Sequence, residues 1–198
     1  MSLLQLTEEL SQRYNIRPSR SKGQNFLIDE RAYEAMLDAA ELTGEETVLE
    51  VGPGLGFLTE RLAARAKKVF AVELDVKLAL AVTKRIAEAK LANVTIYNED
   101  ILNFTGEWTG EARSARKFLV VANLPYNISS FFLRKFISGN EGNILPERLT
   151  LMLQREVGER LVAEPGDMSL LAVSVQFYTS PKIFSLVPAQ SFWPAPKV

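Results

Sequence analysis

Residues 47–56 read TVLEVGPGLG, and this stretch decides the fold. Thr47–Val51 is short and mostly apolar, which predicts a buried strand. The glycines of GPGLG let the backbone turn tightly, and a helix is predicted from Phe57 to Ala66. A strand, a glycine-rich turn and a helix in this order are typical of a parallel α/β sheet.

The alternation of strand and helix continues along the chain. Further strands are predicted at Lys68–Glu73, Val94–Tyr97, Phe118–Ala122, Leu149–Leu153 and Ile183–Val187. Further helices are predicted at Leu3–Tyr14, Glu30–Leu42, Val76–Ala89, Ser129–Ile137 and Arg155–Ala163. Met168–Tyr178 is compatible with a strand or a helix, and the proline-rich tail Ser191–Val198 with a loop. This order predicts an α/β fold with a mostly parallel sheet and helices on both faces.

Composition excludes several kinds of chemistry. The chain has 198 residues, 47% of them apolar, and a net charge of −1, with no cysteine and no histidine. These absences exclude disulfides, thiolate nucleophiles, histidine bases and the usual zinc ligands. No metal is expected. No apolar run approaches the ~18 residues of a membrane span, and the N-terminus has no secretory signal. The lack of cysteine is compatible with a cytoplasmic location.

The glycine turn and a distant acidic residue together suggest a nucleoside cofactor. Glu73 ends the second strand about 20 positions after Gly52, where an acidic side chain can hold a ribose diol. Pro53 removes an N–H group that a pyrophosphate would use, which disfavours NAD but not S-adenosylmethionine. Asp100 follows the third strand and could accept a hydrogen bond from an adenine amine, or cap a turn. The segment 23–27, GQNFL, could close over a ligand or simply anchor a loop.

A second candidate site follows the strand at Phe118–Ala122 and reads Asn123-Leu124-Pro125-Tyr126. An amide oxygen and a backbone carbonyl can accept both N–H bonds of an exocyclic amine, while an aromatic ring stacks on the base. With both protons held, the nitrogen lone pair is directed at an electrophile. A strand-ending turn with a structural asparagine is the alternative that this motif alone leaves open.

Basic residues form three groups that could contact phosphates if they lie on one face. The groups are Arg13, Arg17, Arg20 and Lys22; Arg113, Arg116 and Lys117; and Arg134 and Lys135. Taken singly, each group is also explained by solvated surface charge.

Seven segments, taken in order, resemble one family. They are Arg17–Leu27, Glu50–Gly56, Val72–Asp75, Asn98–Asp100, Asn123–Ser129, Met152–Val157 and Phe192–Val198. Together they are similar to the ribosomal RNA adenine N6,N6-dimethyltransferases of the KsgA type, over nearly the whole chain. The resemblance implies a Rossmann-like, class I S-adenosylmethionine-dependent methyltransferase fold. The family's substrate is a pair of adjacent adenosines near the 3′ end of small-subunit rRNA, in an immature particle, and a monomeric enzyme is expected.

The resemblance also implies residue roles. The residues implied to bind S-adenosylmethionine are Gln24, Asn25, Leu27, Gly52, Gly54, Glu73, Leu74, Asp100, Ile101 and Asn123. Asn123 and the Leu124–Pro125 backbone would hold the target N6. Tyr126 would stack on the target adenine, and Phe192 would cover its other face.

The chain departs from the family pattern in two places. Residues 168–175, MSLLAVSV, lack the aromatic residue and the glycine that the family usually has there. The resemblance also implies a last strand and a small helical domain after Val198, so we expect residues 1–198 to be the catalytic domain, with 1–28 as a cofactor-closing arm, and to bind RNA weakly. Two other readings stay open: a large-subunit rRNA methyltransferase of the erythromycin-resistance type and a non-catalytic RNA-binding assembly factor.

Overall fold

The computed structural model describes residues 1–19, 23–104, 118–125, 127–137 and 145–196. Its helices are α1 (Leu3–Arg13), α2 (Glu30–Ala40), α3 (Phe57–Ala63), α4 (Val76–Glu88), α6 (Ser129–Ile137), α7 (Arg155–Leu161) and α8 (Leu170–Tyr178), with a 3-10 turn at Ala189–Ser191. Its strands are β1 (Phe26–Leu27), β2 (Thr47–Val51), β3 (Lys68–Val72), β4 (Val94–Tyr97), β5 (Phe118–Asn123), β6 (Arg148–Met152) and β7 (Phe192–Trp193). Within these ranges, none of the helices is long and apolar enough to cross a membrane.

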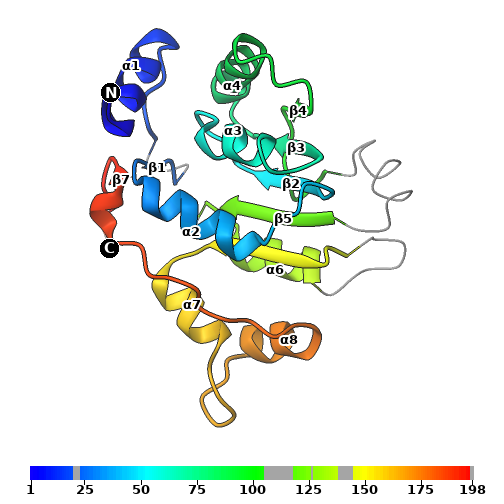
Figure 1. Ribbon diagram of the computed structural model, residues 1–198. Coiled ribbons are helices and arrows are strands. Elements are labelled where there is room, and N and C mark those ends of the chain that lie inside the picture. Colours follow the sequence, from blue (N-terminus) through cyan, green and yellow to red (C-terminus); the bar gives the residue numbers. More distant parts are fainter. Residues whose placement is uncertain (20–22, 105–117, 126, 138–144, 197–198) are drawn as a thin grey trace.

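Five parallel strands form the central sheet in the order β4-β3-β2-β5-β6 (Figure 1). In the middle of the sheet, Thr47 of β2 is paired with Lys68 of β3 and with Phe118 of β5. Every residue of β2 is buried, as expected for a strand that is covered on both faces. The residues of β6, at one edge, are only partly buried. The predicted parallel sheet is confirmed.

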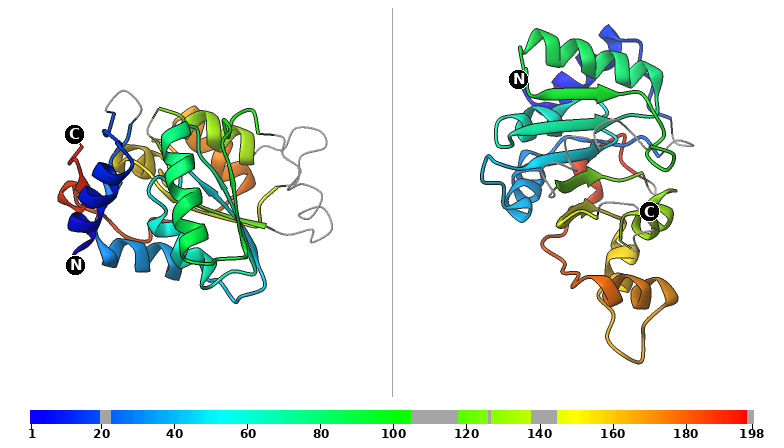
Figure 2. Two further views of the ribbon diagram at one scale, coloured as in Figure 1. Left: turned by 90° about the horizontal axis from the view of Figure 1, so that it is seen from above. Right: turned by 90° about the vertical axis from the view of Figure 1, so that its right-hand side faces the viewer.

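Helices cover both faces of this sheet (Figure 2). On one face, α2, α3 and α4 pack in one core with Val48 and Val121. On the other face, α6 places Phe132 in a second core with Leu49 and Val120. Neighbouring residues of a strand point to opposite faces, which is why Val48 and Leu49 belong to different cores. The prediction of helices on both faces is therefore confirmed.

The sheet has a switch point between β2 and β5. These strands are neighbours, yet the helices that follow them, α3 and α6, lie on opposite faces. Such an arrangement leaves a crevice at the carboxyl ends of the two strands. A Cβ atom at Gly52 would lie 3.9 Å from the carbonyl oxygen of Asn123 and 3.9 Å from Cδ of Pro125. The two sequence motifs are thus side by side at this crevice.

Two predictions for the C-terminal part are wrong. Ile183–Val187 is not a strand, because none of the strands in the described residues pairs with this segment. Its Phe184 is 65% exposed. The tail is not simply a loop, because Phe192–Trp193 pairs antiparallel with Phe26–Leu27. The backbone of a strand needs a neighbouring strand for its N–H and C=O groups, and a local pattern does not reveal whether one is available.

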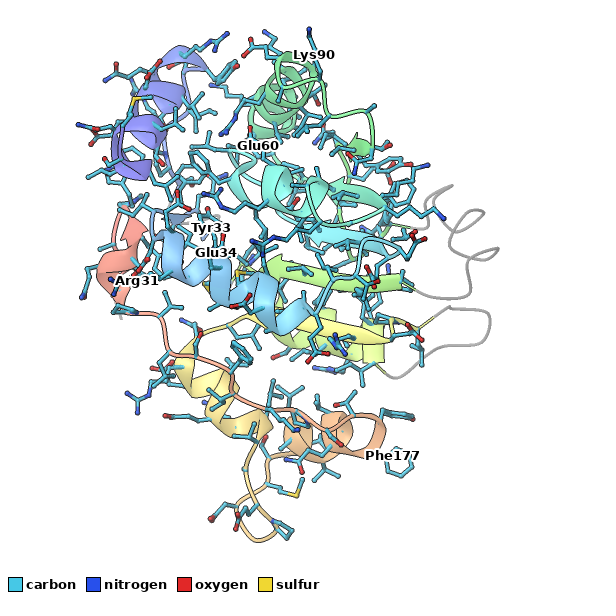
Figure 3. The ribbon with its side chains drawn as sticks, in the orientation of Figure 1. Arg31, Tyr33, Glu34, Glu60, Lys90 and Phe177 are labelled. Atoms are coloured by element: carbon cyan, nitrogen blue, oxygen red, sulfur yellow. The ribbon has the colours of Figure 1, made fainter. Side chains whose placement is uncertain are left out.

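The ambiguous segment Met168–Tyr178 forms the helix α8. Ser169 caps it, since the Ser169 hydroxyl accepts a hydrogen bond of 3.2 Å from the backbone N–H of Ala172. Figure 1 shows α7 and α8 beyond the β6 edge of the sheet, and Phe177 projects from α8 with 79% of its surface exposed (Figure 3).

The glycine turn leads to a stability prediction. Gly56 has φ +84°, and a Cβ atom there would lie 2.7 Å from Cγ2 of Val82. Gly56→Ala is therefore expected to lower the free energy of unfolding by about 1–3 kcal/mol, measured by urea denaturation. Gly158→Ala is the matched control, because Gly158 lies in α7 with nothing within 4 Å of the added Cβ. The control should raise stability by about 0.5–1 kcal/mol. Equal effects of the two changes would contradict this account.

Candidate functional site

A cavity of about 290 Å³ opens at the carboxyl ends of the strands. It is lined by almost all the residues that the sequence nominated: Gln24, Asn25, Leu27, Gly52, Gly54, Glu73, Leu74, Asp100, Ile101, Asn123, Leu124, Pro125 and Phe192. Tyr126 lies outside the described residues. The structure thus brings six separate segments of the chain together, although the role of each residue stays a prediction.

Glu73 joins the glycine turn to the end of β3. Its carboxylate accepts hydrogen bonds from the backbone N–H of Gly54 (3.0 Å) and of Asp75 (2.9 Å). Burial raises the pKa of Glu73, and these two hydrogen bonds partly oppose the rise by stabilising the ionised form. A buried carboxylate held in this way is a rigid acceptor for two adjacent hydroxyl groups.

The loop after β4 carries Asp100. One carboxylate oxygen of Asp100 accepts a hydrogen bond of 2.9 Å from the N–H of Leu102, and the other lies 3.2 Å from Nδ2 of Asn103. The preceding Asn98 donates its amide to the carbonyls of Glu73 (2.8 Å) and Leu74 (3.2 Å). The loop is therefore tied to the end of β3, so that Asp100 and Glu73 line the same cavity.

The Asn123–Pro125 segment continues β5 into α6. Asn123 is paired with Met152 of β6, and the N–H of Leu124 donates to the carbonyl of Met152 at 3.2 Å. Leu124 is buried, whereas Asn123 and Pro125 are half-buried and line the cavity. The backbone of the segment is thus fixed by the sheet, and the half-buried Asn123 lines the cavity.

A two-strand ribbon, β1 with β7, covers one side of the cavity. The rings of Phe26 and Trp193 stack with their centroids 6.4 Å apart. The Ser191 hydroxyl donates to a carboxylate oxygen of Asp29 at 2.7 Å, and this contact lowers the pKa of Asp29. The ribbon places Phe192 on the wall of the cavity. Phe192 is in this way held by the segment 26–29.

Whether the basic groups share one face stays a prediction. Of the residues described, Arg13 pairs with Glu88 at 2.6 Å, and Lys135 donates to backbone carbonyls. Five of the nominated basic residues lie outside the described residues: Arg20, Lys22, Arg113, Arg116 and Lys117.

Sequence reasoning missed Glu50. It lies on β2, lines the cavity and is only 1% exposed. Its Oε2 atom has no hydrogen-bond partner in the described part of the chain. Burial raises the pKa of Glu50 to about 8; the nearby Thr59 hydroxyl opposes the rise, and the negative charge of Glu73 adds to it. An acidic residue inside an otherwise buried strand was the signal that could have identified it.

Glu50 should make stability depend on pH. Its pKa is about 8 in the folded chain against 4.5 as the ordinary value, so between these pH values the folded state binds the extra proton. The stabilisation is fully present below pH 4.5 and is lost as pH rises to 8, about 3 kcal/mol of it by pH 7. Glu50→Gln should abolish this loss, so that the variant is more stable than the unchanged chain at pH 7.5. Parallel pH profiles of urea unfolding for the two chains would contradict the assignment.

The chain resembles one protein family and individual members of it over nearly its whole length. The model of the family described as ribosomal RNA adenine dimethylase matches residues 16–198. Ribosomal RNA small subunit methyltransferase A from Dehalococcoides mccartyi is 42% identical over 198 residues, which are 100% of this chain and 65% of the relative. The protein of the same name from Alkaliphilus oremlandii is 39% identical over 195 residues, 97% of this chain and 66% of the relative. The chain therefore spans just under two thirds of the length of these relatives.

Two solved structures have the same fold. A dimethyladenosine transferase from Plasmodium falciparum superposes with a TM-score of 0.75 at 30% identity, covering 87% of this chain and 59% of that one. The 23S rRNA methyltransferase ErmE superposes with a TM-score of 0.71 at 28% identity, covering 88% of this chain and 66% of that one. The likeness extends over nearly the whole chain, which establishes the methyltransferase-type α/β fold.

Proposed function

The chain belongs to the ribosomal RNA adenine dimethylase family, and from this we propose that it dimethylates adenosine in small-subunit rRNA. The methyl donor is S-adenosylmethionine, and the acceptors are N6 atoms of two adjacent adenosines near the 3′ end of 16S rRNA. The observation that carries the proposal is the single cavity that joins the glycine turn, Glu73 and Asp100 to the Asn123–Pro125 segment. The groups proposed to bind the nucleoside and those proposed to bind the acceptor amine therefore line the same cavity.

The residues of the cavity match S-adenosylmethionine. Glu73 would accept hydrogen bonds from the ribose hydroxyls, and Asp100 from the adenine amine. The ammonium group of the methionine end would favour the ionised form of Glu50, whose Oε2 has no hydrogen-bond partner in the described residues and would then accept from it. Gly52 and Gly54 carry no side chain between the turn and the ligand. When bound, the cofactor supplies an electrophilic methyl group on a sulfonium.

The chain's own residues would position the acceptor nitrogen. The Asn123 amide oxygen and a carbonyl of the Leu124–Pro125 backbone would accept the two N–H bonds of the amine, which leaves the lone pair free to attack. The same oxygens would stabilise positive charge that develops on the nitrogen during transfer. The amine becomes acidic once it is methylated, so its proton can be lost without a histidine. Positioning, rather than acid–base chemistry, is then the main contribution of the site.

Aromatic stacking would hold the target base outside its RNA strand. Phe192 lines the cavity and would cover one face of the adenine. Tyr126, which belongs to the same motif as Asn123, would stack on the other face. The ribbon of β1 and β7 supports this role because it fixes Phe192 against the N-terminal arm, residues 1–28. We infer that residues 1–198 act as a monomeric catalytic domain on an immature small ribosomal subunit in the cytoplasm.

The test is methyl transfer from labelled S-adenosylmethionine to two acceptors. Small-subunit particles that lack the modification are compared with large-subunit particles that lack theirs, and the labelled nucleoside is identified after digestion. Label in N6,N6-dimethyladenosine of the small-subunit RNA supports the proposal. Label in large-subunit RNA would favour the resistance-type activity, which is considered because ErmE has the same fold. Cofactor binding without label in either RNA would favour a non-catalytic role.

A further inference from the structure

Lys135 of α6 is bound to the loop that follows β4. Its Nζ atom lies 3.2 Å from the carbonyl oxygen of Ile101, 2.7 Å from that of Leu102 and 3.3 Å from that of Phe104. An ammonium group has three N–H donors, and these three carbonyls can accept all of them. Partly buried carbonyls are costly to leave without a donor, so the contact holds the loop in one shape.

The loop that Lys135 binds also fixes Asp100. The N–H of Leu102 donates to the Asp100 carboxylate at 2.9 Å, while the carbonyl of Leu102 accepts from Lys135 at 2.7 Å. The same peptide segment therefore links the ammonium to the carboxylate. Burial lowers the pKa of Lys135 and the negative charge of Asp100 opposes that change, which reflects an attraction between the two groups. Removing the ammonium would weaken both the loop and this attraction.

The helix that carries Lys135 also begins at the proposed base-binding segment. The Ser129 hydroxyl and the N–H of Ile128 both donate to the carbonyl of Pro125, at 3.3 Å and 3.2 Å. The first turn of α6 is thus attached to the segment that would hold the target amine, and Lys135 attaches its last turn to the segment that would hold the cofactor's adenine.

We propose that Lys135 is a positioning residue that holds the Asp100 loop in the shape that recognises the 6-amino group of the cofactor's adenine. The inference rests on the proposed function, because that function puts the adenine at Asp100. Lys135 touches neither cofactor nor RNA in this role. It acts through the loop, so its loss should affect recognition of the adenine edge and not the ribose or methionine parts.

The test compares two ligands that differ only at the 6-amino edge of the purine. S-adenosylhomocysteine carries the 6-amino group, and S-inosylhomocysteine carries a 6-oxo group and a proton on N1 instead. Binding of each to the whole chain is measured by calorimetry for the unchanged protein, Lys135→Met and Lys135→Arg. Lys135→Met removes the three donors and keeps most of the aliphatic stem, whereas Lys135→Arg keeps the charge. Lys84→Met, which removes an exposed ammonium on α4, is the matched control.

The unchanged chain should prefer the adenosyl ligand. Lys135→Met should bind that ligand about tenfold more weakly, a typical size for coupling through a neighbouring element, while its affinity for the inosyl ligand stays the same. Lys135→Arg should recover part of the preference, and Lys84→Met should retain all of it. Equal losses for both ligands in Lys135→Met would show general loosening of the fold and overturn the proposal, as would no loss at all.

The binding test involves no RNA, so its result is separate from the test of methylation. Normal ligand discrimination that depends on Lys135, in a chain that methylates no RNA, would support this inference and contradict the proposed function. If the unchanged chain methylates small-subunit RNA and Lys135→Met still discriminates between the two ligands as the unchanged chain does, the result would support the proposed function and contradict this inference. Thermal unfolding identifies any variant that fails to fold. If Lys135→Met does not fold, the ligand preference of Lys135→Arg is compared with that of the unchanged protein instead.

Discussion

Replacing Asn123 by alanine is expected to lower kcat for methyl transfer about 100-fold or more, with cofactor affinity changed much less. Asn123 lines the cavity at the end of β5, where its amide oxygen would hold the acceptor amine. The backbone of Asn123 stays paired with Met152, so the truncation should leave the fold intact. The measurement is single-turnover methylation of small-subunit particles at saturating S-adenosylmethionine.

Asn123→Asp is the matched comparison for Asn123→Ala. An aspartate has nearly the same size and keeps oxygen acceptors in place, so it should retain far more activity than alanine. The two variants should bind S-adenosylhomocysteine comparably in calorimetry. If both lost activity equally, the acceptor oxygen would not be the group that matters, and a structural role for Asn123 would be the better explanation.

Replacing Glu73 by glutamine is expected to raise KM for S-adenosylmethionine by about 10- to 100-fold, the loss that corresponds to hydrogen bonds with a charged acceptor. The kcat at saturating cofactor should change little, because Glu73 would contact the ribose and not the reacting atoms. The variant places an amide N–H₂ where the carboxylate now accepts from the N–H groups of Gly54 and Asp75. Steady-state kinetics with varied cofactor measures the effect.

Glu34→Gln is the control for this second variant. Glu34 lies on the exposed face of α2 (Figure 3), and its partner is Arg65 at 2.7 Å. Glu34→Gln should leave KM and kcat unchanged, because it breaks only a surface ion pair, which contributes little to the stability of the fold. A loss of kcat with unchanged KM in Glu73→Gln would contradict the assignment of Glu73 to cofactor binding.

Local patterns predicted most of the sheet and its candidate site. The apolar runs around Leu49 and Val120 are long enough for buried strands, and parallel strands bring their carboxyl ends to one edge. For that reason the sequence alone predicts that Glu73, Asp100 and Asn123 meet. The structure adds that they line a single cavity.

The features that escaped prediction depend on contacts between distant segments. The pairing of Phe26 with Trp193 joins the two ends of the chain, and neither stretch has the length or alternation of an ordinary strand. Lys135 resembles any other lysine on an amphipathic helix until its Nζ is found beside three carbonyls. Ile183–Val187 shows the opposite case, because a strand-like pattern has no partner strand in the described residues.

The most direct test of the central claim is a crystal structure of the chain with S-adenosylhomocysteine and adenosine. The account predicts ribose hydroxyls within hydrogen-bond distance of the Glu73 carboxylate and the adenine amine of the cofactor on Asp100. It also predicts that N6 of the added adenosine lies within hydrogen-bond distance of the Asn123 amide oxygen, on the same side as the cofactor sulfur. A cofactor bound elsewhere, or an adenosine whose N6 is remote from Asn123, would contradict the account.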